Sequence, residues 1–153
     1  MYLLMKLLMT GLLAGLAMGG FLKLVQVQSG KMVYVLLLNV DYIPGLSNLQ
    51  LNEAFEFLLH LAVSVILIPA FYFPLKKMKL HRKIYPYAVI NLATGGLLFC
   101  TTAFSERTPA FTDGMALLFW LAGHLIYGTL VGIILFNMRL DSDENETKNK
   151  KSI

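Results

Sequence analysis

Two histidines and a glutamate lie within stretches of this sequence that are otherwise almost entirely apolar. Glu56, His60 and Ser64 follow one another at intervals of four residues, and His124 occupies a second apolar stretch. Residues four apart lie on nearly the same face of a helix, because a helix has about 3.6 residues per turn. Imidazoles and carboxylates can exchange protons or bind a metal ion, so these side chains are the first candidates for chemistry.

The elements that must position these residues are helices that cross a membrane, which takes about 20 apolar residues. The chain of 153 residues is 57% hydrophobic and 14% charged, whereas soluble domains carry about 25% charged residues. We therefore predict an all-α, polytopic membrane protein, a bundle of four transmembrane helices in residues 1–138, followed by a disordered polar tail in residues 139–153. The predicted spans are residues 3–25, 54–75, 84–104 and 116–137.

The basic residues predict how this bundle is oriented. The connection between the second and third spans, KKMKLHRK, holds five lysines and arginines, and such clusters favour the cytoplasmic side. Four spans then place both termini in the cytoplasm as well. Because the basic loop explains the net charge of +4, we expect the lipid bilayer as partner and no nucleic acid.

The longest connection is residues 26–53, between the first two spans. It contains MVYVLLLNV, an apolar run that is too short to cross the bilayer. This run either lies along the outer surface of the membrane or caps the bundle, and its pattern does not choose between the two.

The two histidines are expected at similar depths in the outer half of the membrane. At about 1.5 Å per residue, His60 lies roughly 9 Å and His124 roughly 12 Å past the start of its span. A charged side chain that faces lipid costs several kcal/mol, so Glu56 and both histidines should turn toward the bundle interior. With Ser64 and Thr101, they would line an outward-facing polar cavity.

Glycines repeat at the spacing of close helix contacts. Gly11, Gly15 and Gly19 form two overlapping G-x-x-x-G units in the first span, and Gly128 and Gly132 form another in the fourth. Small residues at this spacing let two membrane helices approach each other closely. The partner is either a helix of the same chain or one of a second copy or another membrane protein.

The polar residues allow three functions. The leading interpretation is a protein without a cofactor whose cavity responds to, or conducts, protons or small ions. The first alternative is a redox subunit in which Glu56, His60 and His124 bind zinc, or the histidines bind haem. The second is a structural partner subunit whose polar residues only bond across helices. Since no nucleotide-binding loop, nucleophile elbow or H-E-x-x-H motif occurs, we do not expect an enzyme.

Two stretches, GLLAGLAMGG in the first predicted span and GHLIYGTLVG in the fourth, resemble those of small bacterial inner-membrane proteins similar to YagU. The resemblance implies a multi-pass protein of the bacterial plasma membrane with a link to acid tolerance and no established biochemical activity. It supplies no catalytic residues. The histidine of the fourth span, His124, recurs in such proteins.

Overall fold

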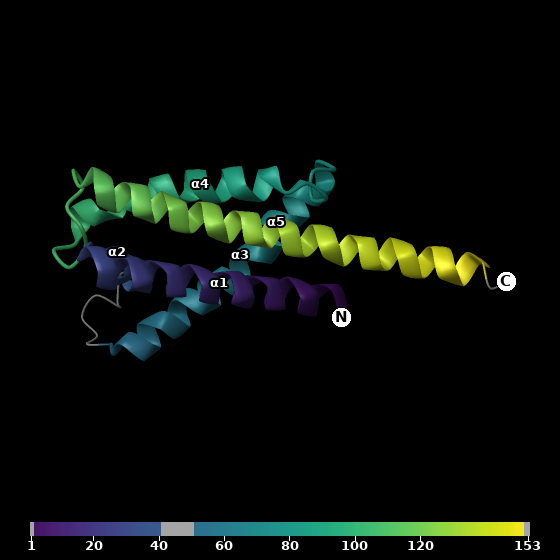
Figure 1. Ribbon diagram of the computed structural model, residues 1–153, viewed down its shortest axis with the longest axis horizontal. Coiled ribbons are helices and arrows are strands. Elements are labelled where there is room, and N and C mark those ends of the chain that lie inside the picture. Colours follow the sequence, from purple (N-terminus) through teal and green to yellow (C-terminus); the bar gives the residue numbers. More distant parts are fainter. Residues whose placement is uncertain (1, 41–50, 152–153) are drawn as a thin grey trace.

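The computed structural model describes residues 2–40 and 51–151, with the side chains of residues 3–40 and 51–138. The described chain is all-helical, which confirms the predicted fold class (Figure 1). Its elements are α1 (Tyr2–Ser29), α2 (Val33–Leu38), α3 (Glu53–Lys77), α4 (Tyr85–Phe99), the 3₁₀ helix η1 (Cys100–Phe104) and α5 (Gly114–Lys151).

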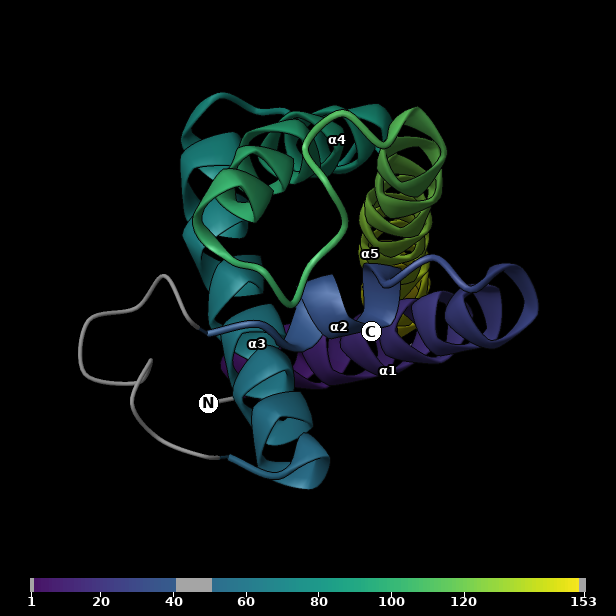
Figure 2. The ribbon, with the colours of Figure 1, turned by 90° about the vertical axis from the view of Figure 1, so that its left-hand side faces the viewer.

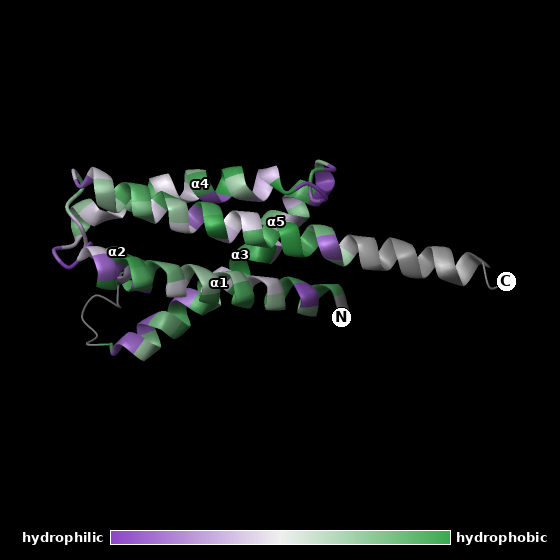
Figure 3. Cartoon of the chain, viewed as in Figure 1, coloured by the Kyte–Doolittle hydropathy of each residue, from purple (hydrophilic) through white to green (hydrophobic). Residues whose placement is uncertain are grey.

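Within the described residues, four helical segments are long and apolar enough to cross a membrane, as the composition predicts. Figure 3 shows that hydrophobic residues cover most of their length and that hydrophilic residues gather toward the ends. Large apolar side chains, such as Ile66 and Leu97, are exposed on the outside of the bundle, where lipid rather than water suits them. The four segments are Leu3–Ser29, Glu53–Lys77, Tyr85–Phe104 and Gly114–Met138.

The helix ends follow from local chemistry. The side chain of Asn52 accepts a hydrogen bond of 2.9 Å from the Phe55 amide and so caps the start of α3. Lys76 and Lys77 in its last turn complement the negative end of the helix dipole. Gly30 follows the end of α1 with a φ of +71°, a backbone conformation that glycine adopts without strain.

The last helix is longer than the sequence analysis expected. The backbone of α5 stays helical through Lys151, whereas residues 139–153 were expected to form a disordered tail. The segment after Gly132 contains no glycine or proline that would end a helix. The polar residues from Arg139 on therefore end the apolar stretch but not the helix.

Close contacts at glycines hold the helices together in the order α3, α1, α5 and α4. A Cβ added to Gly11 on α1 would lie 2.7 Å from the carbonyl oxygen of Ser64 on α3. A Cβ added to Gly128 on α5 would lie 2.5 Å from the carbonyl oxygen of Tyr87 on α4. Gly15 and Gly19 also face α3, and Gly132 faces α4. The predicted glycine ridges thus pack against helices of the same chain.

The two ends of the bundle differ in what they carry. Figure 1 shows both termini and the connection between α3 and α4 at one end, which we call the terminal end. At the opposite end, the α2 end, lie α2 and the connection between η1 and α5. The termini and the basic loop therefore lie at the same end of the bundle, as they must if the chain crosses the membrane four times.

The short helix α2 caps the bundle at the α2 end. It packs against α1, α3 and α5, and Val33, Leu36 and Leu38 are buried (Figure 2). The side chain of Gln26 on α1 accepts hydrogen bonds from the amides of Tyr34 and Val35 and so holds the start of α2. The apolar run therefore enters the bundle, while residues 41–50 lie outside the described chain.

Candidate functional site

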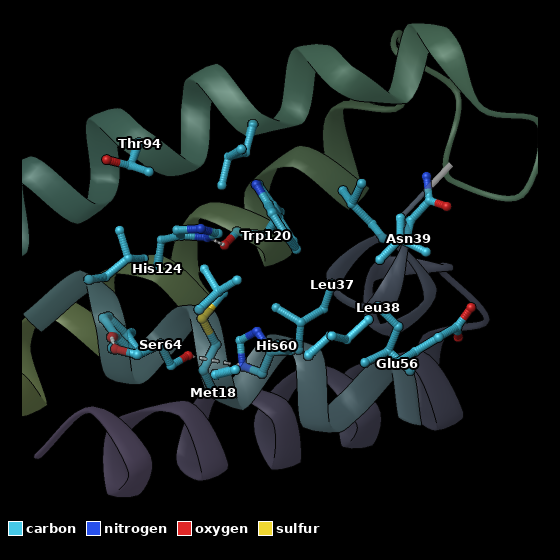
Figure 4. Close-up of a pocket in the computed structure, with 18 of the residues that line it drawn as sticks. Met18, Leu37, Leu38, Asn39, Glu56, His60, Ser64, Thr94, Trp120 and His124 are labelled. Carbon is cyan, nitrogen blue, oxygen red and sulfur yellow. Dashed lines mark hydrogen bonds between the residues drawn. The ribbon is translucent and has the colours of Figure 1, made fainter. Parts of the chain in front are cut away.

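All five residues predicted to form a cavity line one pocket of about 240 Å³. The pocket lies between α3 on one side and α4, η1 and α5 on the other, and residues 36–40 cover it at the α2 end (Figure 4). Most of its lining is apolar. The predicted residues in its wall are Glu56, His60, Ser64, Thr101 and His124.

The buried carboxylate of Glu56 is neutralised by an arginine. Arg107, in the connection between η1 and α5, places Nη2 3.1 Å from Oε1 of Glu56. The side chain of Glu56 is 6% exposed and that of Arg107 is 51% exposed, so the arginine reaches in from the surface. The sequence analysis expected Glu56 to turn toward the bundle interior, and it does line the pocket, where it is bonded to Arg107 because the loop folds back over the start of α3.

His60 is held by α1 and by its own helix. Its Nε2 lies 3.3 Å from the carbonyl oxygen of Gly15 and 3.5 Å from Oγ of Ser64. The ring also stacks on Phe57 with 5.9 Å between ring centroids. A carbonyl oxygen can only accept, so Nε2 of His60 carries the hydrogen and Nδ1 is left as an acceptor.

His124 is oriented in a similar way on α5. Its Nδ1 lies 3.1 Å from the carbonyl oxygen of Trp120, so Nδ1 donates and Nε2 carries the free lone pair. The side chain is buried at the pocket wall, and Nε2 has no bonding partner among the side chains and backbone that the structure describes. Figure 4 shows His60 and His124 on opposite walls of the pocket.

Two residues, Trp120 and Gly95, fix the position of the His124 ring. The indole of Trp120 packs against it with 4.5 Å between ring centroids, and Nε1 of Trp120 donates to the carbonyl oxygen of Gly95 at 2.8 Å. A Cβ on Gly95 would lie 2.5 Å from Cγ of His124, so only glycine leaves room for the imidazole. Tyr127 completes the wall and donates to the carbonyl oxygen of Ser64 at 2.8 Å.

Thr101 contributes little to the chemistry of the pocket. Its hydroxyl donates to the carbonyl oxygen of Leu98 at 2.7 Å, a bond within its own helical turn. The hydroxyl of Ser64, by contrast, lies beside His60. Of the five predicted residues, the two histidines, on opposite walls, therefore keep nitrogens available for bonding in the pocket.

The arrangement does not fit the metal or haem alternative. Over the described side chains, no three histidine, cysteine, aspartate or glutamate residues come together as metal ligands, so Glu56, His60 and His124 do not form a zinc site. Axial haem ligation needs a nitrogen from each imidazole, but Nε2 of His60 faces α1. The pocket is also smaller than the roughly 300–1,000 Å³ of ordinary small-molecule sites.

The sequence analysis missed several residues that shape the site. Trp120 and Tyr127 lie four residues before and three residues after His124, on the same helix face, and this signal was present in the sequence. Asn91 is buried in the middle of α4 and lines the pocket, and a polar residue inside an apolar span could also have been noticed in the sequence. Arg107 carried no comparable signal, because its position depends on the path of a loop.

Comparisons with protein-family models, with curated proteins and with solved structures find no match to this chain.

Proposed function

We propose that this is a non-enzymatic, multi-pass protein of the bacterial plasma membrane, with both termini in the cytoplasm, whose pocket responds to protons through His60 and His124. The observation that carries the proposal is the pair of imidazoles on separate helices in one largely apolar pocket. Each uses one nitrogen to hold its orientation and has no carboxylate partner in the described structure. Protonation of either ring therefore creates a charge that the pocket does not neutralise.

The charges around the histidines support a coupling between protonation and the arrangement of the pocket. In the part of the wall that the structure describes, the only other ionisable group on α3 is Glu56, which Arg107 already neutralises. On α5 it is Tyr127, whose hydroxyl is bonded to Ser64. The lining parts of α1, α2, α4 and η1 carry no ionisable side chain. Since an uncompensated charge in apolar surroundings is costly, proton uptake must favour a rearranged or hydrated pocket.

The location and direction in the membrane rest on the sequence. The basic loop at the terminal end supports a cytoplasmic position for that end, which puts the pocket in the outer half of the bilayer. The resemblance to proteins similar to YagU supports a bacterial plasma membrane and a role in the response to external acid. A pocket in the outer half lies nearer to that acid than to the cytoplasm.

Trp120 is the chain's single tryptophan and lies against His124, so it can report on that ring directly. Protonated imidazole quenches a neighbouring indole. We expect the emission of the protein in lipid nanodiscs to fall between pH 8 and pH 3.5, and His124→Gln to abolish the transition. The control His81→Gln, in the loop at the terminal end, should keep it. An unchanged transition in His124→Gln, or none in the unaltered protein, would refute the proposal.

The direction in the membrane can be tested through the single cysteine. Cys100 is replaced by alanine, and one new cysteine is placed at Lys79 in the basic loop or at Thr112 near the α2 end. With intact cells, we expect a membrane-impermeant maleimide to label Thr112→Cys and not Lys79→Cys. The opposite result would place the termini outside.

A further inference from the structure

We propose that the pocket binds the head of an uncharged, single-chain amphiphile that carries a hydroxyl group and enters sideways from the bilayer, between α3 and α4. This inference deepens the proposed function, since it names the ligand class of the same pocket and rests on the same two imidazoles. Three properties of the pocket support it: the position of its opening, the bonding capacity of its polar atoms, and its size.

The pocket opens sideways rather than along the bundle axis. α3 packs on α1 and α4 packs on α5, while α3 and α4 make no extended contact with each other. Val63 and Ile66 on α3 and Leu98 on α4 line the pocket and are also exposed on the outside of the bundle. At the α2 end, residues 36–40, all buried except the half-buried Leu37, and the Glu56–Arg107 pair cover it. The exposed rim is therefore apolar and lies at the depth of the lipid chains.

The ring nitrogens left as acceptors favour a ligand that carries an uncharged hydrogen-bond donor. Nε2 of His124 and Nδ1 of His60 are the nitrogens that the neutral rings leave as acceptors. A hydroxyl group donates to such a nitrogen, whereas an ether or a carbonyl oxygen cannot. Among the residues that the structure describes, the only formal charge in the wall is on Glu56, which is already paired with Arg107, so a charged head finds no counter-charge there. Protonation of the rings would remove both acceptors and release the ligand.

The volume of the pocket limits how much of the ligand it can hold. The pocket offers about 240 Å³, less than the roughly 300–1,000 Å³ of sites that enclose a whole drug-sized ligand. That is enough for a hydroxyl head and the first few carbons of a chain. The rest of the chain must leave through the apolar opening between α3 and α4, where it contacts lipid. A head with two chains, or a bulky ring system, exceeds this space.

The test is photo-crosslinking in phosphatidylcholine nanodiscs with dodecan-1-ol that carries a diazirine beside its hydroxyl end. We expect labelled peptides from α3 and α5 around His60 and His124. Val63→Phe, which fills the opening, should reduce this labelling at least fivefold. The matched control Val89→Phe alters an equally exposed valine on α4 that does not line the pocket, and it should change nothing. Equal labelling in both variants, or labelling spread evenly over lipid-facing peptides, would overturn the proposal.

Competition separates the chemistry of the head from simple partition into lipid. Unlabelled dodecan-1-ol should compete with the probe, whereas dodecyl methyl ether, which lacks the donor, and dodecyl phosphate, which is charged, should not. Equal competition by the ether would show that no hydrogen bond selects the ligand, and the inference would fail. If the Trp120 emission still responds to pH in that case, only the ligand class is refuted and the proton response stands.

Discussion

The hydroxyl of Tyr127 on α5 donates a hydrogen bond of 2.8 Å to the carbonyl oxygen of Ser64 on α3. These two helices pack on α1 from different sides rather than on each other, so the bond joins walls of the pocket that are otherwise separate. The next residue on α3, Val65, is where α1 approaches most closely: a Cβ added to Gly11 would lie 2.7 Å from the Cα of Val65.

Tyr127→Phe should therefore destabilise the bundle modestly and loosen the pocket. Interhelical hydrogen bonds in membrane proteins contribute about 0.6 kcal/mol on average and at most roughly 1.7 kcal/mol. The free energy of unfolding can be measured by circular dichroism during a titration with sodium dodecyl sulfate. Tyr85→Phe, which alters an exposed tyrosine on α4, is the control and should leave that free energy unchanged. Equal losses in both variants would mean that the Tyr127 bond has no special role.

Gly95→Ala should be far more harmful than Gly96→Ala, although the two glycines are neighbours in α4. The added methyl group at Gly95 would meet the ring of His124 at 2.5 Å, whereas nothing lies within 4 Å of a Cβ on Gly96. Overpacking of this kind costs about 1–3 kcal/mol. At Gly96, alanine should be neutral or slightly stabilising, because it favours a helix more than glycine. The same unfolding measurement tests both, and a reversed order would contradict the position of His124.

Removal of Arg107 should destabilise the protein, because the buried carboxylate of Glu56 would lose its partner. Arg107→Ala strands the buried Glu56, and an unpaired buried polar group costs roughly 1–3 kcal/mol. The double variant with Glu56→Gln should recover part of this loss, because the amide carries no charge. Lys23→Ala breaks the exposed pair with Glu53 and should change little. A harmless Arg107→Ala would show that Glu56 is not held by this pair.

The pair of Lys31 and Asp113 should give a stability contribution that disappears in acid. A hydrogen bond of 2.8 Å from Lys31 lowers the pKa of Asp113 below its ordinary value of 3.8, and the amide of Ala116 acts in the same direction. A lowered pKa in the folded state means that the contribution is present above pH 3.8 and is lost as the pH falls through the folded value.

Asp113→Asn should accordingly lower the midpoint of thermal unfolding at pH 7, and the difference from the unaltered protein should shrink below pH 3.8. Lys31→Gln should produce the same loss at pH 7, because it removes the other half of the pair. A difference that stays constant at all pH values would exclude ionisation of Asp113 as its cause.

The sequence predicted the spans and the polar face because both depend on local patterns. Apolar stretches of sufficient length cross the membrane whatever their partners are, and spacings of four residues placed Glu56, His60 and Ser64 on one face of α3. The burial of α2 was open, because a short apolar run looks the same at a membrane surface and in a core.

The remaining features depend on contacts between distant parts of the chain. Arg107 lies 51 residues from Glu56, and the loop that brings them together has no regular pattern to read. The separation of α3 from α4 likewise depends on packing. The connection between them would allow the two helices to lie side by side, but α3 packs on α1 and α4 packs on α5. The five residues predicted for the cavity do line one pocket, but the bonding partner of Glu56 and the position of the pocket opening could be found only in the structure.

The most direct measurement is the protonation of the ring nitrogens by NMR on the nanodisc-embedded protein, with ¹⁵N in its three histidines. We expect the nitrogens of His60 and His124 to change from the neutral to the protonated pattern between pH 8 and pH 3.5, with the indole N–H resonance of Trp120 shifting in step. If only His81 titrates over that range, or the pocket rings titrate while Trp120 stays unchanged, the proposed proton response is contradicted.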